Sequence, residues 1–298
     1  MNPTTAVLEE RITQLEGGLA SVAVSSGQAA SAFAIQNLCQ AGDNIVPSTD
    51  LYGGTWNQFE NTFKKLGIEV RFADPKDPMS FVKLSDSKTR AFYGETLPNP
   101  KLNVLPIEEI ASLGKELGIP LIVDNTAAPI TCKPIEYGAA IVIHSLTKWI
   151  GGHGTSIGGI IVDGGNFDWT KIPERHPNFN QPEPSYWNWV LSKVVPDVLG
   201  ANITFAVRLR FVLLRDLGSA LSPTNAFNFI QGLETLPIRF KKHQENAEKV
   251  ADYLTGKNNV NRVINPKYQL GIHKERAEKY LKDGNGPLVG FELKGGIE

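Results

Sequence analysis

The length, composition and charge of the chain exclude several classes of protein. With 298 residues and a net charge of −1, the chain can bury one large core or two moderate ones, and it has no charge excess that would favour nucleic acid or an anionic membrane as a partner. The basic runs at 239–249 and 273–282 are interleaved with acids at helical spacing, as on a solvated helix face. No apolar run reaches the roughly 18 residues of a membrane span, so no membrane partner is expected.

The two cysteines give no sign of a disulfide framework or a metal site. Cys39 and Cys132 are far apart in the sequence, and neither belongs to a C-x-x-C pair. A reducing compartment, the cytoplasm, is the expected location.

From residue 27 onward, helical and strand patterns alternate along the chain. Helices are predicted over 27–42, 54–67 and 106–118, and apolar strands over 44–48, 68–74, 89–96, 120–126 and 139–146. Strands this apolar, separated by helices, indicate an α/β fold with a mainly parallel central sheet between helices.

The pattern changes after a further apolar segment at 157–165. Residues 166–187 are rich in proline, asparagine and aromatic residues without a usable period, which predicts a long irregular loop. The remaining predicted elements are long helices over 189–218 and 233–256, strands near 259–266 and 286–296, and a helix over 273–282. We interpret this last part as the opening of a second, smaller α/β domain that is too short to complete its own sheet.

Polar side chains follow several predicted strands, where ligands of such sheets bind. They are Glu95, Thr96 and Asn99 after one strand, Asp124, Asn125 and Thr126 after the next, and Ser145, Thr147 and Lys148 after a third. In addition, "SSGQAA" opens a helix at Gly27 and Gln28, which places free backbone N–H groups where an anion can bind.

Each of these signals is weak alone, because a strand-end acid commonly caps a turn and a lone lysine is usually solvated. Their combination on one sheet edge matches what pyridoxal phosphate requires: anion donors for its phosphate, a carboxylate for its ring nitrogen and an amine for a Schiff base. A nucleotide-binding α/β domain is the rival from another class, but the chain lacks a G-x-G-x-x-G motif and that reading leaves Lys148 unexplained.

Six motifs carry a resemblance to a known family over almost the whole chain. In this sequence they read "SSGQAA", "LYGGT", "ETLPNP", "VDNT", "SLTKWIGGHGT" and "QGLETLPIR". Together they resemble the trans-sulfuration, or Cys/Met metabolism, family of pyridoxal-phosphate enzymes. The resemblance implies a fold-type I transferase-like α/β fold and a bound pyridoxal 5'-phosphate.

The resemblance also implies roles for individual residues. Lys148 resembles the lysine that bonds to the cofactor and moves protons, and Asp124 resembles the carboxylate that pairs with the ring nitrogen. Tyr52 is similar to the tyrosine that stacks on the ring and assists proton transfer. The implied phosphate cradle consists of Ser145, Thr147, Gly27 and Gln28, and the implied further contacts around the ring are Thr126 and Asn99.

The activity implied by the resemblance is γ-replacement, in which O-acetylhomoserine and sulfide give homocysteine and acetate in methionine and cysteine biosynthesis. The sequence "SGQAA", the aromatic insertion and Asn57 favour this branch of the family. Methionine γ-lyase and cystathionine synthase or lyase activities are alternatives within the family. The alternative from another class is a catalytically incompetent fragment that binds cofactor or pairs with an intact subunit.

The ends of the sequence depart from the family pattern. The family's Tyr and Arg before "NPT" and its carboxylate-binding Arg in the second domain have no counterpart here, so we expect a chain shortened at both ends. The predicted divisions are a remnant of an N-terminal arm (1–16), a cofactor-binding large domain (17–236) and the start of a small domain (237–298). By resemblance we also expect a homo-oligomer, a dimer or a tetramer.

Overall fold

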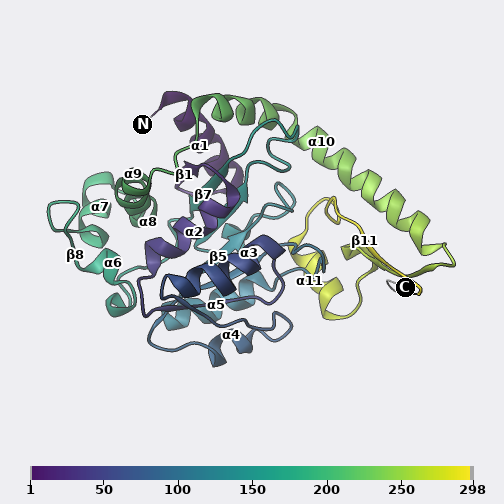
Figure 1. Ribbon diagram of the computed structural model, residues 1–298, viewed down its shortest axis with the longest axis horizontal. Coiled ribbons are helices and arrows are strands. Elements are labelled where there is room, and N and C mark those ends of the chain that lie inside the picture. The colour runs from purple at the N-terminus through teal and green to yellow at the C-terminus, as the bar shows by residue number, and fades with distance from the viewer. Residues whose placement is uncertain (1, 296–298) are drawn as a thin grey trace.

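A seven-stranded sheet forms the centre of the molecule in the computed structural model, which describes residues 2–295 (Figure 1). Its strands, in spatial order, are β1 (Ala20–Val24), β7 (Gly159–Asp163), β6 (Ile141–Ser145), β5 (Leu121–Asp124), β4 (Thr89–Glu95), β2 (Asn44–Pro47) and β3 (Glu69–Val70). The five strands from β6 to β3 pair in parallel, whereas β7 runs antiparallel to both of its neighbours. The predicted mainly parallel sheet is confirmed.

Helices cover both faces of this sheet, as the α/β prediction requires. The α-helices before residue 166 are α1 (Pro3–Glu16), α2 (Gly27–Leu38), α3 (Gly53–Asn57), α4 (Met79–Lys83) and α5 (Ile107–Leu117). Those after it are α6 (Pro177–Asn180), α7 (Leu191–Leu199), α8 (Thr204–Arg208), α9 (Arg215–Leu217), α10 (Pro223–Thr255) and α11 (Ile272–Tyr280). Two π-helical segments, η1 (Gln58–Phe63) and η4 (Leu209–Leu214), continue α3 and α8.

Alternating side chains of the strands build two apolar cores, one on each face. In β6, Val142 belongs to one core while Ile141 and Ile143 belong to the other. The first core also holds Leu8 of α1 and Phe229 of α10, and the second is covered by α2, η1 and α8. Because both faces are covered, the strands are apolar throughout, which is why the sequence predicts them well.

The N-terminal part of the chain differs from the prediction in one strand and one helix. Strand β1 was not predicted, and it forms the antiparallel edge of the sheet beside β7. Residues 3–16, predicted as the remnant of an arm, form helix α1, whose buried side chains pack in the first core. The predicted domain division at residues 236 and 237 stays a prediction, and it falls inside α10.

The predictions for the chain after residue 165, a long irregular loop followed by two long helices, were partly wrong. The stretch 166–187 contains the short helix α6 and strand β8 (Pro182–Glu183), which pairs with β9 (Trp189–Val190). The helix predicted over 189–218 is interrupted after α7 by Gly200, which has a left-handed φ of 66°. The helix predicted to start at 233 begins at Pro223, capped by the Ser222 side chain.

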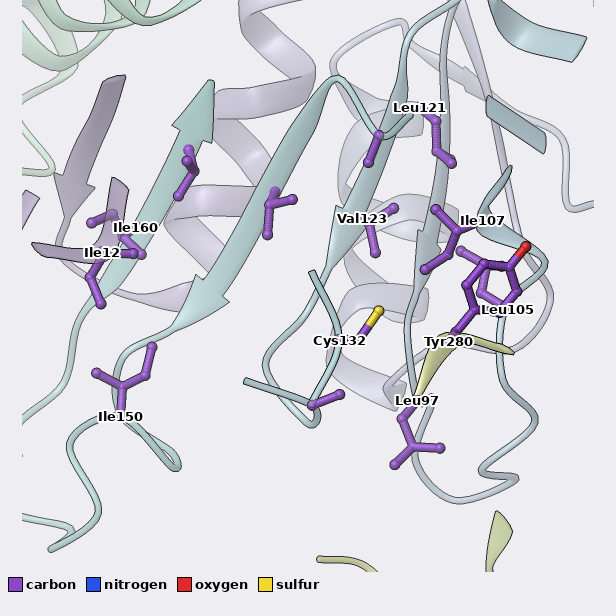
Figure 2. Packing of buried hydrophobic residues seen from close by; sticks show 14 of the residues in the cluster. Ile12, Leu97, Leu105, Ile107, Leu121, Val123, Cys132, Ile150, Ile160 and Tyr280 are labelled. Atoms are coloured by element: carbon purple, nitrogen blue, oxygen red, sulfur yellow. The ribbon is translucent and has the colours of Figure 1, made fainter. Parts of the chain in front are cut away.

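The C-terminal part of the chain forms a small sheet beside the large one. Strands β10 (Val260–Ile264) and β11 (Gly290–Leu293) pair antiparallel, and α11 lies between them in sequence. Figure 2 shows Tyr280 of α11 among Leu105 and Ile107 of the first core. Among residues 2–295, no helix is both long enough and apolar enough to cross a bilayer.

Candidate active site

The N-terminus of α2 lies against the end of β6. The Ser26 hydroxyl caps the helix by accepting the Ala29 N–H at 3.0 Å. The N–H groups of Gly27 and Gln28 belong to the first turn, where the helix has no carbonyl to accept them. A Cβ atom on Gly27 would lie 2.6 Å from the Cβ of Ser145, so only glycine allows this approach. The result is a group of N–H donors beside a serine, at the positive end of a helix dipole.

A hydrogen-bonded chain joins the ends of β5 and β6. Asp124 Oδ1 accepts the Thr126 N–H at 2.9 Å, and the Thr126 hydroxyl accepts the Ser145 N–H at 2.7 Å. Burial raises the pKa of Asp124, while the bonds from Thr126 act in the opposite direction. An enclosed carboxylate of this kind is stabilised by a bound cation or by an N–H donor.

A second carboxyl group lies next to Asp124 on the neighbouring strand. Glu95 ends β4, pairs in register with Asp124 and is only 6% exposed. Its Oε1 accepts the Tyr52 N–H at 2.7 Å, which fixes the residue that precedes α3. The Tyr52 side chain is 51% exposed. Burial and the charge of Asp124 raise the pKa of Glu95 well above its usual range.

Lys148 lies in a tight turn that follows β6. Its N–H donates to the Ser145 carbonyl at 3.2 Å, and its carbonyl accepts the Gly152 N–H at 2.7 Å. The Thr147 hydroxyl donates to the Gly158 carbonyl at 3.2 Å and accepts the Gly158 N–H at 3.1 Å. The backbone on both sides of Lys148 is therefore fixed by hydrogen bonds, while the side chain that carries its amine can still rotate.

Arg239 of α10 holds the same turn from the opposite side. Its guanidinium donates to the carbonyls of Trp149 at 3.0 Å and Ile150 at 3.3 Å, and to Gly232 of its own helix at 2.7 Å. A Cβ atom on Gly152 would lie 2.1 Å from this guanidinium. The glycines after Lys148 thus allow the close approach of α10, and Arg239 satisfies carbonyls that the tight turn leaves free.

The α2 N-terminus, the two acids and the turn of Lys148 line one cavity of about 610 Å³ at the carboxyl ends of β4, β5 and β6. All nine predicted site residues are on its wall: Gly27, Gln28, Tyr52, Asn99, Asp124, Thr126, Ser145, Thr147 and Lys148. The structure brings together segments that are more than a hundred residues apart, because parallel strands end at the same edge.

Other residues of the wall were not among the predicted site residues. They include Ser26, Thr55, Glu95, Leu97, Trp149, Ile157, His243 and Leu288. His243 lies in a basic run that we interpreted as a solvated helix face, and its ring is 5.0 Å from that of Trp149. No sequence signal distinguishes this histidine from its charged neighbours. Glu95 was recognised from the sequence as a polar residue at the end of its strand, but no role was assigned to it.

Comparison with known proteins gives consistent matches along the whole chain. The Cys/Met metabolism PLP-dependent enzyme family matches residues 1–298. The O-acetyl-L-homoserine sulfhydrylase of Leptospira meyeri is 48% identical, over 100% of this chain and 68% of the relative. The homocysteine/cysteine synthase of Saccharomyces cerevisiae is also 48% identical, over 98% of this chain and 65% of the relative. The chain therefore spans about two thirds of the length of these relatives.

Solved structures agree with the sequence matches. An O-acetylhomoserine (thiol)-lyase from Campylobacter jejuni superposes with a TM-score of 0.93 at 38% identity, covering 98% of this chain and 71% of that one. That crystal structure contains a pyridoxyl-lysine phosphate. The O-acetylhomoserine sulfhydrylase of Wolinella succinogenes superposes with a TM-score of 0.84 at 32% identity, covering 98% of this chain and 80% of that one.

Proposed function

The chain belongs to the Cys/Met metabolism family of PLP-dependent enzymes, and from that premise we propose that its cavity catalyses a γ-replacement. In this reaction sulfide forms a C–S bond at Cγ of O-acetylhomoserine while the C–O bond to acetate breaks, which gives homocysteine. The observation that carries the proposal is the convergence of Lys148, Asp124 and the α2 N-terminus on one cavity.

The residues of the cavity fit pyridoxal phosphate by their chemistry. The free N–H groups of Gly27 and Gln28, together with the Ser145 hydroxyl, provide donors for a phosphate. Asp124 provides the enclosed carboxylate that a protonated ring nitrogen would neutralise. Lys148 provides the amine for the covalent link to the cofactor aldehyde. Tyr52, at the rim, provides an aromatic face. When bound, the cofactor supplies an electron sink for negative charge that develops on substrate carbons.

The reaction also requires a proton carrier, and Lys148 is our candidate. The turn from Ser145 to Gly152 fixes its backbone, so Nζ can reach different substrate carbons by rotation of the side chain alone. Thr126 holds the Asp124 carboxylate in place through its N–H and so supports the contact to the ring nitrogen. We assign Asn99 and Thr147 to positioning of the ligand and of the turn.

The choice of O-acetylhomoserine as substrate rests on the relatives. Proteins with this activity in their names are 48% identical to the chain in Leptospira meyeri and 45% identical in Thermus thermophilus. Since the chain spans about two thirds of the Leptospira relative, we propose the activity for the whole protein.

Replacement of the lysine tests the proposed site. Lys148→Ala should remove the visible absorbance of lysine-bound pyridoxal phosphate and lower kcat by about 10³-fold, within the range of lost acid–base catalysis. Lys193→Ala, at an exposed position in α7, is the matched control and should change neither quantity. A Lys148→Ala protein that kept the absorbance band and normal turnover would contradict the proposal.

A panel of substrates then tests the reaction itself. The protein is incubated with sulfide and either O-acetylhomoserine or O-succinylhomoserine, and separately with cystathionine or methionine. We expect homocysteine and acetate from the first mixture at the highest kcat/KM. Release of a 2-oxo acid from methionine or cystathionine at a higher kcat/KM would favour a lyase. Cofactor binding without turnover of any substrate would favour a non-catalytic chain.

We further propose a homo-oligomer, a dimer or a tetramer, and a cytoplasmic location. The two cysteines, Cys39 and Cys132, are unpaired and buried, which supports a reducing compartment. Size-exclusion chromatography with light scattering measures the oligomeric state, and a monomer at working concentration would contradict that part of the proposal.

A further inference from the structure

Glu95 is an acid that the proposed chemistry leaves without a role, although it lines the cavity. It is 6% exposed and is the register partner of Asp124, so both side chains project from the same face of neighbouring parallel strands. Two like charges enclosed side by side cannot both remain ionised at neutral pH without compensation. One of the two carboxyl groups must therefore hold a proton or be neutralised by a cation.

The surroundings of Glu95 select it as the protonated partner. Burial and the carboxylates of Asp124 and Asp50 raise the pKa of Glu95, and the hydrogen bond from the Tyr52 N–H opposes them without cancelling them. Asp50 is itself compensated by the Lys101 ammonium at 2.5 Å. Each of the two carboxyl groups accepts one backbone N–H, but only for Asp124 do a neighbouring side chain, Thr126, and the charge of His144 also lower the pKa. Asp124 is therefore the better site for the negative charge.

The hydrogen bond of Glu95 leads to the rim of the cavity. Its Oε1 accepts the Tyr52 N–H at 2.7 Å, and Tyr52 immediately precedes α3. The Tyr52 ring lies within van der Waals reach of Gly54, where a Cβ atom would approach Tyr52 Cε1 to 2.5 Å. The position of the Tyr52 ring is thus set by its approach to Gly54 and by the hydrogen bond from its backbone to Glu95. Only the bond to Glu95 connects Tyr52 to the central sheet.

We propose that Glu95 is a positioning residue of the site: as a neutral carboxylic acid it holds the Tyr52 backbone at the rim of the cavity and leaves Asp124 as the single anion beneath the bound ring. The inference rests on the proposed function for the identity of that ring. The contact between Glu95 and Tyr52 and the proposed protonation of Glu95 do not depend on a bound cofactor.

The test compares Glu95→Gln, which keeps the shape and the neutral acceptor, with Glu95→Ala, which removes the acceptor, in the full chain before and after cofactor addition. Glu10→Gln, at an exposed position in α1, is the control for removal of one acid. Before cofactor addition, hydrogen exchange of the Tyr52 amide should be unchanged in Glu95→Gln and about tenfold faster in Glu95→Ala, as expected for one net hydrogen bond. Infrared difference spectra at pH 7 should show a protonated carboxyl in the parent protein that Glu95→Gln lacks.

Cofactor titration completes the test. Glu95→Gln should bind pyridoxal phosphate within about threefold of the parent protein, whereas Glu95→Ala should bind it about tenfold more weakly. Equal weakening by both variants, with no protonated-carboxyl signal from Glu95, would overturn the inference, as would unchanged Tyr52 exchange in Glu95→Ala.

If Glu95→Ala does not fold, Glu95→Asp replaces it, since its shorter side chain draws the acceptor away from the Tyr52 N–H, and faster exchange is again the expected result. The exchange and infrared measurements do not depend on the cofactor. A failure of the proposed function, seen with Lys148→Ala, is therefore distinguishable from a failure of this inference.

Discussion

The central sheet and the C-terminal strand pair of the same chain differ in how completely their strands are covered. All seven residues of β4 are buried, whereas β11 leaves Phe291 50% exposed. The site occupies the ends of the covered strands and takes Leu288 from the region before β11. Strands packed on both faces cannot shift without disturbing two cores, so they hold side chains at their ends in fixed positions. The covered sheet therefore fixes most of the cavity wall, and the segment before β11 adds Leu288 to it.

Truncation of a core side chain should produce the largest effect on stability. Phe92 of β4 is fully buried between β2 and β5 and packs edge-on against Phe81. Phe92→Ala should lower the free energy of unfolding by about 3–5 kcal/mol, through lost burial and the cavity that remains. Urea unfolding followed by circular dichroism measures it. A loss below about 1 kcal/mol would show that the covered sheet tolerates cavities as well as an exposed strand does.

Neutralisation of Asp124, the acid at the end of β5, should weaken binding of the cofactor without unfolding the sheet. We expect Asp124→Asn to reduce affinity for pyridoxal phosphate by about 10- to 100-fold, because it removes a charge-assisted hydrogen bond worth about 1.5–3 kcal/mol. Equilibrium titration of the visible absorbance measures this affinity. Unchanged affinity would mean that Asp124 does not contact the ring nitrogen.

Arg239 tests whether α10 stabilises the turn of Lys148. Arg239→Gln loses part of the guanidinium contact to the carbonyls of Trp149 and Ile150, and we expect a cost of about 1–2 kcal/mol in stability, since the side chain is partly exposed. Hydrogen exchange at Gly151 and Gly152 should become faster. Lys242→Ala, whose ion pair with Glu245 is exposed on the same helix, should cost less than about 0.5 kcal/mol. Equal exchange in the two variants would contradict the assignment.

Two buried titratable groups, Asp163 at the end of β7 and His176 in the loop that follows it, should give opposite pH dependences. Burial raises the pKa of Asp163 to about 7 from 3.8, so the folded protein holds this proton more tightly than the unfolded chain and stability falls as pH rises between these values. Burial lowers the pKa of His176 to about 4 from 6.5, so the unfolded chain binds this proton more tightly than the folded protein does. The folded protein therefore loses stability as pH falls between these two values.

The two contributions oppose each other between about pH 4 and 6.5. Asp163→Asn should therefore leave the pH dependence caused by His176 unopposed. The loss of stability in acid should become steeper by about 1.4 kcal/mol per pH unit. Urea unfolding across this range measures the slopes, and identical slopes in the two proteins would show that Asp163 titrates normally.

The smallest effect is expected in the C-terminal strand pair. Phe291→Ala, at a half-exposed position of β11, should change the free energy of unfolding by no more than about 1 kcal/mol. The same urea titration used for Phe92→Ala gives the value. A loss as large as that of Phe92→Ala would show that the strand pair is buried against something in solution.

The sequence predicts the covered sheet well and its surroundings less well, for physical reasons. Strands such as β4 and β5 carry continuous apolar runs because both of their faces are packed, and the polar residues after them meet because parallel strands end together. The cavity wall around Lys148, Asp124 and Gly27 follows from that rule.

Other features depend on tertiary contacts that leave no local pattern. Strand β1 is short, contains a polar residue and is defined by its pairing with β7. His243 reaches the cavity because Arg239 and Gly232 bring α10 against the turn of Lys148, and no periodicity in its basic run reveals this. The break after α7 depends on one glycine, Gly200, at a left-handed φ.

The 33 residues of α10 form one helix, so the number of residues between two points on it fixes the directions in which their side chains point. Figure 1 shows the helix running from α1 to the C-terminal strands, with a change of direction along its length that Pro237 explains. Its axis is roughly 50 Å long, and each residue advances the rotation by about 100°. One inserted residue after Arg239 would therefore turn His243 away from the cavity and rotate everything beyond it, whereas an insertion of about seven residues would nearly restore the phase. Natural and engineered changes of length in this helix should follow that rule.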